Sequence, residues 1–300
     1  MPANLEEIES LVGQSSSGRG REALMKRIAQ DPSSPLLYRE NDTLVGILVF
    51  EEAPWESRIL ERKVAKLSFI RGDKRLSYDA LVSAARNLLA QLDDRMMEGG
   101  FKMISVRVSE RSAGLIHALE QNGFRFIEVL LTFRHDLKDL DDFGDSHFIR
   151  ASNKGDIEEV CAVAFNSFSF SRFHSDPLIA PAQANLSRAE WVRKACEGSA
   201  DEVFVAVEDN TIAGFITCRI LSNGGNDARG IIDLTAVLPQ FRGRGIGSSL
   251  VKRAQLYFRG KAEAVSVGTQ SKNIPSIGLY QKLGFRPVSS EVTLHKHYSQ

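Results

Sequence analysis

The stretch PQFRGRGIG, residues 239–247, joins an apolar segment, IIDLTAV, to an amphipathic one, SSLVKRAQLYF. Its three glycines let the backbone turn tightly and approach a ligand closely. The first N–H groups of the helix that follows point outward with the positive end of the helix dipole. We therefore expect a pyrophosphate to bind at this turn, with positive charge added by Arg242 and Arg244.

Other readings of this glycine-rich turn fit less well. A dinucleotide fingerprint places Gly-x-Gly-x-x-Gly after the first strand of a domain, whereas this turn comes mid-domain and its glycines have a different spacing. A P-loop requires Gly-Lys-Ser/Thr, which the stretch lacks. A tight strand-to-helix turn without any ligand is the plain alternative, and the flanking arginines weigh against it.

A weak internal repeat divides the chain into two halves. Two stretches have a similar residue pattern that leads to Gly-Phe-Arg: SIGLYQKLGFRP (276–287) and GLIHALEQNGFRF (114–126). The same order of hairpin, strand, long helix and strand precedes each copy, which favours a duplication. Alignment on Gly-Phe-Arg pairs Val106 with Val267, Ser112 with Asn273 and Leu119 with Tyr280. We place the domains at residues 1–145 and 146–300, separated by the acidic segment before residue 146.

The second half resembles the GNAT superfamily of acetyltransferases. The resemblance rests on R-x-x-G-x-G at Arg242–Gly247, followed by Asn273, Tyr280, Gly284 and Phe285 with the family's spacing. It implies an α/β (α+β) fold with two tandem GNAT-like domains, each with a mixed, splayed sheet. The first domain is degenerate, because no such turn precedes its helix. The co-substrate acetyl-CoA would lie in the splay between IIDLTAV and AEAVSVGT.

This resemblance implies roles for particular residues. A tyrosine near the departing thiolate can donate a proton, since a phenol has a pKa slightly above that of a thiol; we expect Tyr280 in that role. Asp233 is a candidate base or water-holder, or a carboxylate that orients a neighbour. A backbone N–H near Ala236-Val237 would stabilise the oxyanion, and Asn273 would hold the pantetheine arm. The expected cofactor-binding residues are Ala236, Val237, Arg242, Gly243, Arg244, Gly245, Ile246, Gly247 and Asn273.

A narrower resemblance concerns the amine that is acetylated. Pro54-Trp55-Glu56, Ser171-Arg172-Phe173 and Glu190-Trp191-Val192 are similar to segments of the TDP-amino-sugar acetyltransferases, typified by TDP-fucosamine acetyltransferase. That resemblance implies an amino deoxysugar linked to a nucleotide as acceptor. Trp55 and Phe173 could offer flat faces to a ring, Arg172 could pair with a diphosphate, and His174 is a further candidate. An amino acid, a peptide or protein N-terminus, or an aminoglycoside is the alternative acceptor.

Composition restricts the remaining function classes. The net charge of +0 predicts no broad nucleic-acid or anionic-membrane surface. No apolar run is long enough to span a bilayer, and MPANLEEIESLVGQ does not resemble a signal peptide, so we expect a cytoplasmic protein. Cys161, Cys196 and Cys218 lack metal-ligand spacing, which predicts free thiols and no metal. A homodimer is compatible with these features.

Overall fold

The computed structural model describes residues 5–13, 22, 24–26, 28–29, 35–73, 75–138, 140, 148–222 and 228–299. The chain forms two compact units. Unit 1 comprises Met1–Ile127 and Glu291–Gln300, and unit 2 comprises Glu128–Ser290. The predicted boundary between residues 145 and 146 lies outside the described residues.

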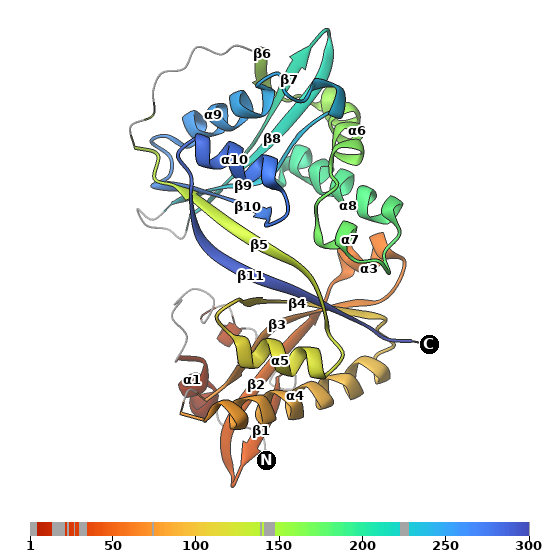
Figure 1. The fold of residues 1–300 in the computed structure, drawn as a ribbon, viewed down its shortest axis with the longest axis vertical. Coiled ribbons are helices and arrows are strands. Elements are labelled where there is room, and N and C mark those ends of the chain that lie inside the picture. Colours follow the sequence, from red (N-terminus) through yellow and green to blue (C-terminus); the bar gives the residue numbers. More distant parts are fainter. Residues whose placement is uncertain are drawn as a thin grey trace. The chain divides into compact units, whose positions relative to one another are not determined.

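Unit 1 has a mixed sheet in the order β1-β2-β3-β4-β11 (Figure 1). The strands that precede its long helix form a meander, and β4 then joins β3 in parallel. Its elements are α1 (Leu5–Gly13), β1 (Leu36–Glu40), β2 (Thr43–Glu52), α3 (Pro54–Leu60), β3 (Val64–Gly72), α4 (Tyr78–Glu98), β4 (Met103–Ser109) and α5 (Ala113–Gln121).

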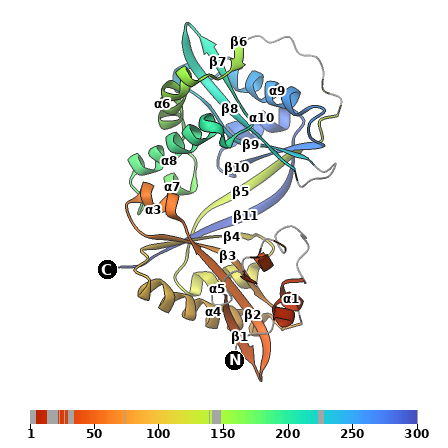
Figure 2. The same ribbon diagram turned by 180° about the vertical axis from the view of Figure 1, so that it is seen from behind.

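Unit 2 repeats this order of elements around the sheet β5-β10-β9-β8-β7-β6. Its helices and strands are β6 (Phe148–Ala151), α6 (Ile157–Ser167), α7 (Arg172–Ser175), α8 (Pro181–Lys194), β7 (Glu202–Glu208), β8 (Thr211–Leu221), β9 (Arg229–Val237), α9 (Ile246–Phe258), β10 (Ala264–Gln270) and α10 (Ile274–Lys282). The helices α9 and α10 cover one face of this sheet, and α6 and α8 cover the other (Figures 1 and 2).

Two strands are exchanged between the halves of the chain. β5 (Arg125–His135) follows the last helix of the first half, yet its residues 130–135 pair with β10 in unit 2. β11 (Arg286–His297) follows the last helix of the second half, and its residues 291–297 pair with β4 in unit 1. The repeat does not predict this exchange, so the compact units differ from two consecutive ranges.

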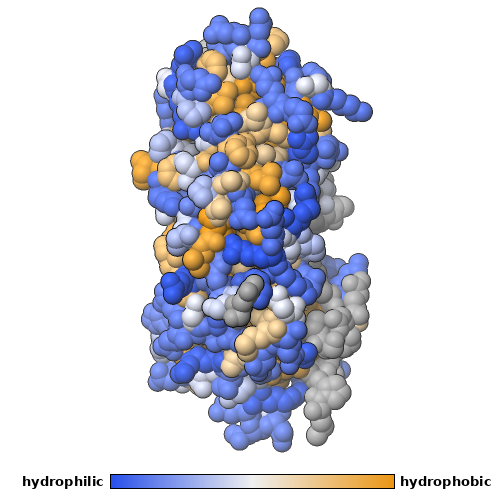
Figure 3. All heavy atoms as spheres, turned by 90° about the vertical axis from the view of Figure 1, so that its right-hand side faces the viewer, coloured by the Kyte–Doolittle hydropathy of each residue, from blue (hydrophilic) through white to orange (hydrophobic). Residues whose placement is uncertain are grey.

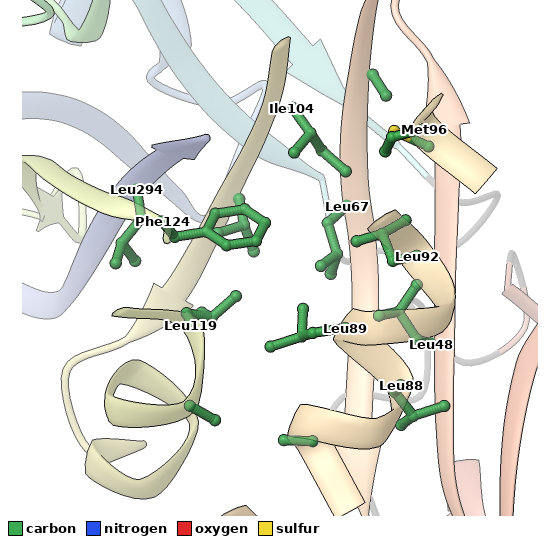
Figure 4. Packing of buried hydrophobic residues seen from close by; sticks show 14 of the residues in the cluster. Leu48, Leu67, Leu88, Leu89, Leu92, Met96, Ile104, Leu119, Phe124 and Leu294 are labelled. Carbon is green, nitrogen blue, oxygen red and sulfur yellow. The ribbon is translucent and has the colours of Figure 1, made fainter. Parts of the chain in front are cut away.

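The two units have separate apolar cores. In unit 1, Leu88, Leu89 and Leu92 of α4 pack on β3 and β4 together with Leu294 of the exchanged strand (Figure 4). In unit 2 one cluster lies under α9 and α10 and includes Tyr280, while a second lies under α6 and α8. Burial of these side chains is the main stabilising contribution to each unit.

The local turn chemistry follows the sequence. Hairpins form at Asn41-Asp42 and at Asp209-Asn210, whose residues have positive φ, the conformation that a two-residue hairpin turn requires. The segment beginning at Pro54 forms α3, with proline in its first turn. Among the helices that the structure describes, none is long and apolar enough to cross a membrane.

Candidate functional site

The glycine-rich turn leads directly into α9. Gly243 and Gly245 have φ of 80° and 88°, a left-handed conformation that L side chains rarely adopt. Gly245 is the N-cap residue and provides no side-chain cap. The N–H of Ser249 bonds to the Gly245 carbonyl, 3.1 Å away, so the amides of the residues between them precede the first intrahelical bond. These N–H groups are suited to an anion.

The two arginines of the turn bond to backbone carbonyls. Nε of Arg242 donates to the Val237 carbonyl (3.0 Å), and one terminal nitrogen donates to the Ser167 carbonyl (2.6 Å) at the end of α6. Arg244 donates to the Gln240 carbonyl at 3.3 Å and remains exposed. Arg242 therefore braces the turn against β9 and α6, in addition to the phosphate contact expected from sequence.

The strands β9 and β10 separate where the turn begins. Their parallel pairing runs from Arg229 and Ala264 to Ile232 and Val267 and then stops, although both strands continue. β9 stays paired with β8, and β10 stays paired with β5. Backbone groups of residues 233–237 that face the opening therefore have no ladder partner on β10. The predicted splay is present, with Ala236 and Val237 on its β9 side.

A bulge in β9 accompanies this separation. Thr217 on β8 faces two residues of β9, because the register passes from Ile216–Thr235 to Cys218–Ile232. The Thr217 hydroxyl accepts from the Leu234 N–H (2.9 Å) and lies 3.4 Å from the Leu234 carbonyl. A bulge bends its strand and increases its twist, which directs the end of β9 away from β10. Sequence reasoning missed Thr217, and neither strand pattern contains a signal for it.

Tyr280 and Asn273 lie at opposite ends of the same helix face. Asn273 is the N-cap of α10; its side-chain oxygen accepts from the Ser276 N–H (3.4 Å), and its amide nitrogen donates to the Thr269 hydroxyl (3.1 Å). Tyr280 follows about two turns later and is 4% exposed. Burial raises the pKa of Tyr280, which keeps the phenol protonated.

Asp233 lies at the bulge and forms an ion pair. Its two oxygens accept from Nε and a terminal nitrogen of Arg219, each at 2.8 Å. Such a bidentate pair fixes the orientation of a carboxylate. This arrangement supports the third role considered for Asp233, a carboxylate that orients a neighbour, over that of a free base.

The residues predicted to bind the acceptor separate into two groups. Arg172, Phe173 and His174 form most of α7 in unit 2, whereas Trp55 lies in α3 of unit 1. Phe173 is 1% exposed, so the expectation that its ring offers a free face is wrong; the ring packs inside the protein, with the Arg172 guanidinium 4.7 Å from its centroid. His174 is half-buried, and both of its ring nitrogens are hydrogen-bonded.

Unit 1 has a similar separation of strands but lacks the glycine-rich turn and the tyrosine. β3 and β4 stop pairing at Leu67 and Val106, and β3 carries an extra residue, Ser68, just beyond. Where unit 2 has the glycine-rich turn, unit 1 has Asp73, 4% exposed, whose carboxylate accepts from the backbone and side chain of Arg75. Ser77 caps α4 through the Ala80 N–H. An acid and a cap therefore replace the anion-binding groups, and Leu119 stands at the position of Tyr280.

Comparison with known proteins agrees with this geometry. Residues 167–285 match the acetyltransferase (GNAT) family. This part of the chain therefore has the GNAT fold and is similar to the acetyltransferases of that family. The matched residues run from the end of α6 through Phe285 and include the turn, the splay and Tyr280. Members of that family use acetyl-CoA as the acyl donor.

Particular relatives extend the similarity to the first half of the chain. It is 28% identical over 261 residues to the spore coat polysaccharide biosynthesis protein SpsD of Bacillus subtilis, covering 85% of each chain. A GCN5-related N-acetyltransferase from Sphaerobacter thermophilus shares the fold over 99% of this chain and 93% of its own (TM-score 0.63, 17% identity). A tandem GNAT protein from the clavulanic acid biosynthesis pathway shares the fold over 99% of this chain and 94% of its own (TM-score 0.61, 15% identity). The tandem arrangement therefore occurs in a solved structure of this fold.

Proposed function

We propose that this GNAT protein transfers an acetyl group from acetyl-CoA to the amino group of a nucleotide-linked amino deoxysugar. The observation that carries the acetyl transfer is the opening between β9 and β10, which ends at the turn containing Gly243 and Gly245. Free helix N–H groups and open strand backbone together suit a ligand with a pyrophosphate and an amide-containing arm.

Acetyl-CoA supplies an acyl group activated as a thioester. The amides at the start of α9 would hold its pyrophosphate, and Arg242 keeps that turn in place through the Val237 and Ser167 carbonyls. The acceptor amine attacks as a neutral nucleophile and forms the new C–N bond as the C–S bond breaks. A backbone N–H near Ala236-Val237 would stabilise the oxyanion.

Tyr280 would complete the transfer by protonating the departing thiolate. Its buried phenol remains neutral well above physiological pH, because burial disfavours the phenolate. The amine proton leaves to solvent or to a basic group. Asp233 is held by Arg219, which favours water as the first proton acceptor.

Support for the sugar acceptor comes from the similarity to SpsD. That protein is named for polysaccharide biosynthesis, and the similarity covers 85% of this chain, including the exchanged strands and the first half. The segments that resemble TDP-amino-sugar acetyltransferases occur in both halves of the chain, around Trp55 in the first half and around Arg172 and Trp191 in the second. The site is in unit 2, and α7 and α8 lie on the side that carries α6 (Figure 1).

A direct test measures CoA release with a panel of acceptors. We expect turnover with TDP-4-amino deoxysugars and much slower release with amino acids, aminoglycosides and peptides. Turnover of peptides without any turnover of a sugar nucleotide would refute the acceptor. Absence of CoA release with every amine, combined with absence of acetyl-CoA binding by calorimetry, would refute the acetyltransferase itself.

A further inference from the structure

A hydrogen-bonded chain fixes the short helix α7 to α8. Nδ1 of His174 lies 2.6 Å from the Ser171 hydroxyl, and Nε2 lies 2.8 Å from Oδ1 of Asn185. Ser171 also caps α7 through the His174 N–H at 3.3 Å. Both partners of the imidazole ring are uncharged. A neutral imidazole can form both hydrogen bonds, and neither partner is a carboxylate that would favour the imidazolium.

The charges around His174 are positive. Burial lowers the pKa of His174, its hydrogen bond to Asn185 opposes this, and Arg188 and Lys272 lower the pKa further. Arg172 adds a third cation on α7 itself. The carboxylate at the end of α7, Asp176, is 3% exposed and accepts from the Leu178 N–H, so it lies largely beneath the surface.

Lys272 connects this cationic region to the acetyl-transfer site. Its Nζ donates to the Ser175 hydroxyl at 2.6 Å, an uncharged partner, while the side chain is exposed. Lys272 directly precedes Asn273, which caps α10, and lies two residues after the end of β10, the strand that forms one side of the splay. A lysine ammonium has three donors, and the serine takes one. The others can reach a ligand at the end of β10.

Apolar groups flank the same region. Figure 3 views unit 2 from the side of α6, α7 and α8 and shows apolar side chains among polar ones. Exposed apolar residues on these helices include Phe165, Leu186 and Trp191, and the Arg188 guanidinium lies 5.2 Å from the Trp191 ring centroid. Such a surface suits a ligand with an apolar body and a charged group.

We propose that α7, the part of α8 from Asn185 to Arg188, and Lys272 form a phosphate subsite for the acceptor. The inference rests on the proposed acetyl transfer and extends it: the acceptor carries phosphate, and Lys272 binds that phosphate directly. The subsite is distinct from the pyrophosphate turn of α9. It favours a sugar nucleotide over a peptide N-terminus, because a peptide has no obligatory anion near its amine.

Calorimetry with inorganic pyrophosphate tests this subsite when the protein is saturated with CoA, which occupies the α9 turn. We expect pyrophosphate to bind the CoA complex of the wild type and Lys272→Ala to raise its Kd by about tenfold or more, the loss typical of a charge-assisted hydrogen bond. Asn185→Asp, which places a carboxylate beside His174, should weaken binding to a similar extent. Lys282→Ala removes the same charge from the last turn of α10 and should leave the Kd unchanged.

Equal pyrophosphate affinity in the wild type and Lys272→Ala would overturn the inference, as would binding of succinate in preference to pyrophosphate. No binding of pyrophosphate to the CoA complex would overturn it as well. In each of these cases intact CoA binding leaves the acetyltransferase function standing. Failure of CoA itself to bind would instead contradict the proposed function.

Discussion

Replacing Thr217 with valine should destabilise unit 2 and weaken acetyl-CoA binding, because the Thr217 hydroxyl holds the bulge in β9. Thr217 is 1% exposed and accepts from the Leu234 N–H at 2.9 Å. Valine has the same shape but leaves that buried N–H without its partner, a loss of about 1–3 kcal/mol. For a unit of this size the melting temperature should fall by about 2–4 °C for each kcal/mol.

The matched control is Thr217→Ser, which keeps the hydroxyl and removes a methyl group worth about 1 kcal/mol. Both variants should therefore lose stability in thermal unfolding, but they should differ in cofactor binding. The valine variant should raise the KM for acetyl-CoA several-fold, since the end of β9 is no longer directed away from β10, while the serine variant should retain the wild-type KM. Unchanged stability and KM in Thr217→Val would refute the role assigned to the bulge.

Further expectations concern the other parts of the site and the exchanged strand. Tyr280→Phe should lower kcat by about 100-fold or more with little change in acetyl-CoA affinity, whereas Tyr257→Phe on α9 should keep the wild-type rate; full activity of Tyr280→Phe would remove Tyr280 from the acid role. Gly245→Glu should abolish the rise in melting temperature caused by acetyl-CoA. Gly260→Glu imposes the same charge at a positive φ of 78° beyond the other end of α9 and should retain it; loss of the rise in both would indicate general damage. Asp93→Ala should lower the free energy of urea unfolding by about 1.5–3 kcal/mol, because Asp93 binds Lys296 at 2.7 Å and Tyr298 at 2.8 Å. The exposed neighbour Asp94→Ala should have little effect, and equal effects of the two would contradict that role.

The parts of the fold that sequence predicts are those encoded by neighbouring residues. Asn41-Asp42 and Asp209-Asn210 specify hairpins because these residues tolerate positive φ. The glycines at 243 and 245 indicate the turn for the same reason. The alignment of Val106 with Val267 is also informative, because each is the last residue of its parallel pairing. Asp73 could have been found by comparing the two halves, since an acid stands before the helix that lacks the turn.

Long-range pairing is not encoded in this way. The alternation of apolar and polar residues in β5 and β11 predicts strands with two different faces, but it does not indicate which strand each will pair with. Thr217 has the sequence context of any buried strand threonine, and its role depends on an extra residue in the opposite strand. Arg242 appears as a free cation in the motif because its carbonyl partner on Ser167 is 75 residues away.

The exchange of strands makes the core of each unit depend on a strand from the other half of the chain. Unit 1 has the splay and the extra residue of β3, but Asp73 and the Ser77 cap stand where unit 2 has the glycine-rich turn. Leu294, fully buried in the core of unit 1, belongs to the strand that continues from α10, and Phe133, buried against Tyr280, belongs to the strand that continues from α5. Removing the first half would therefore delete β5 and expose the cluster that buries Tyr280. The first half of the chain therefore supplies part of the core around Tyr280.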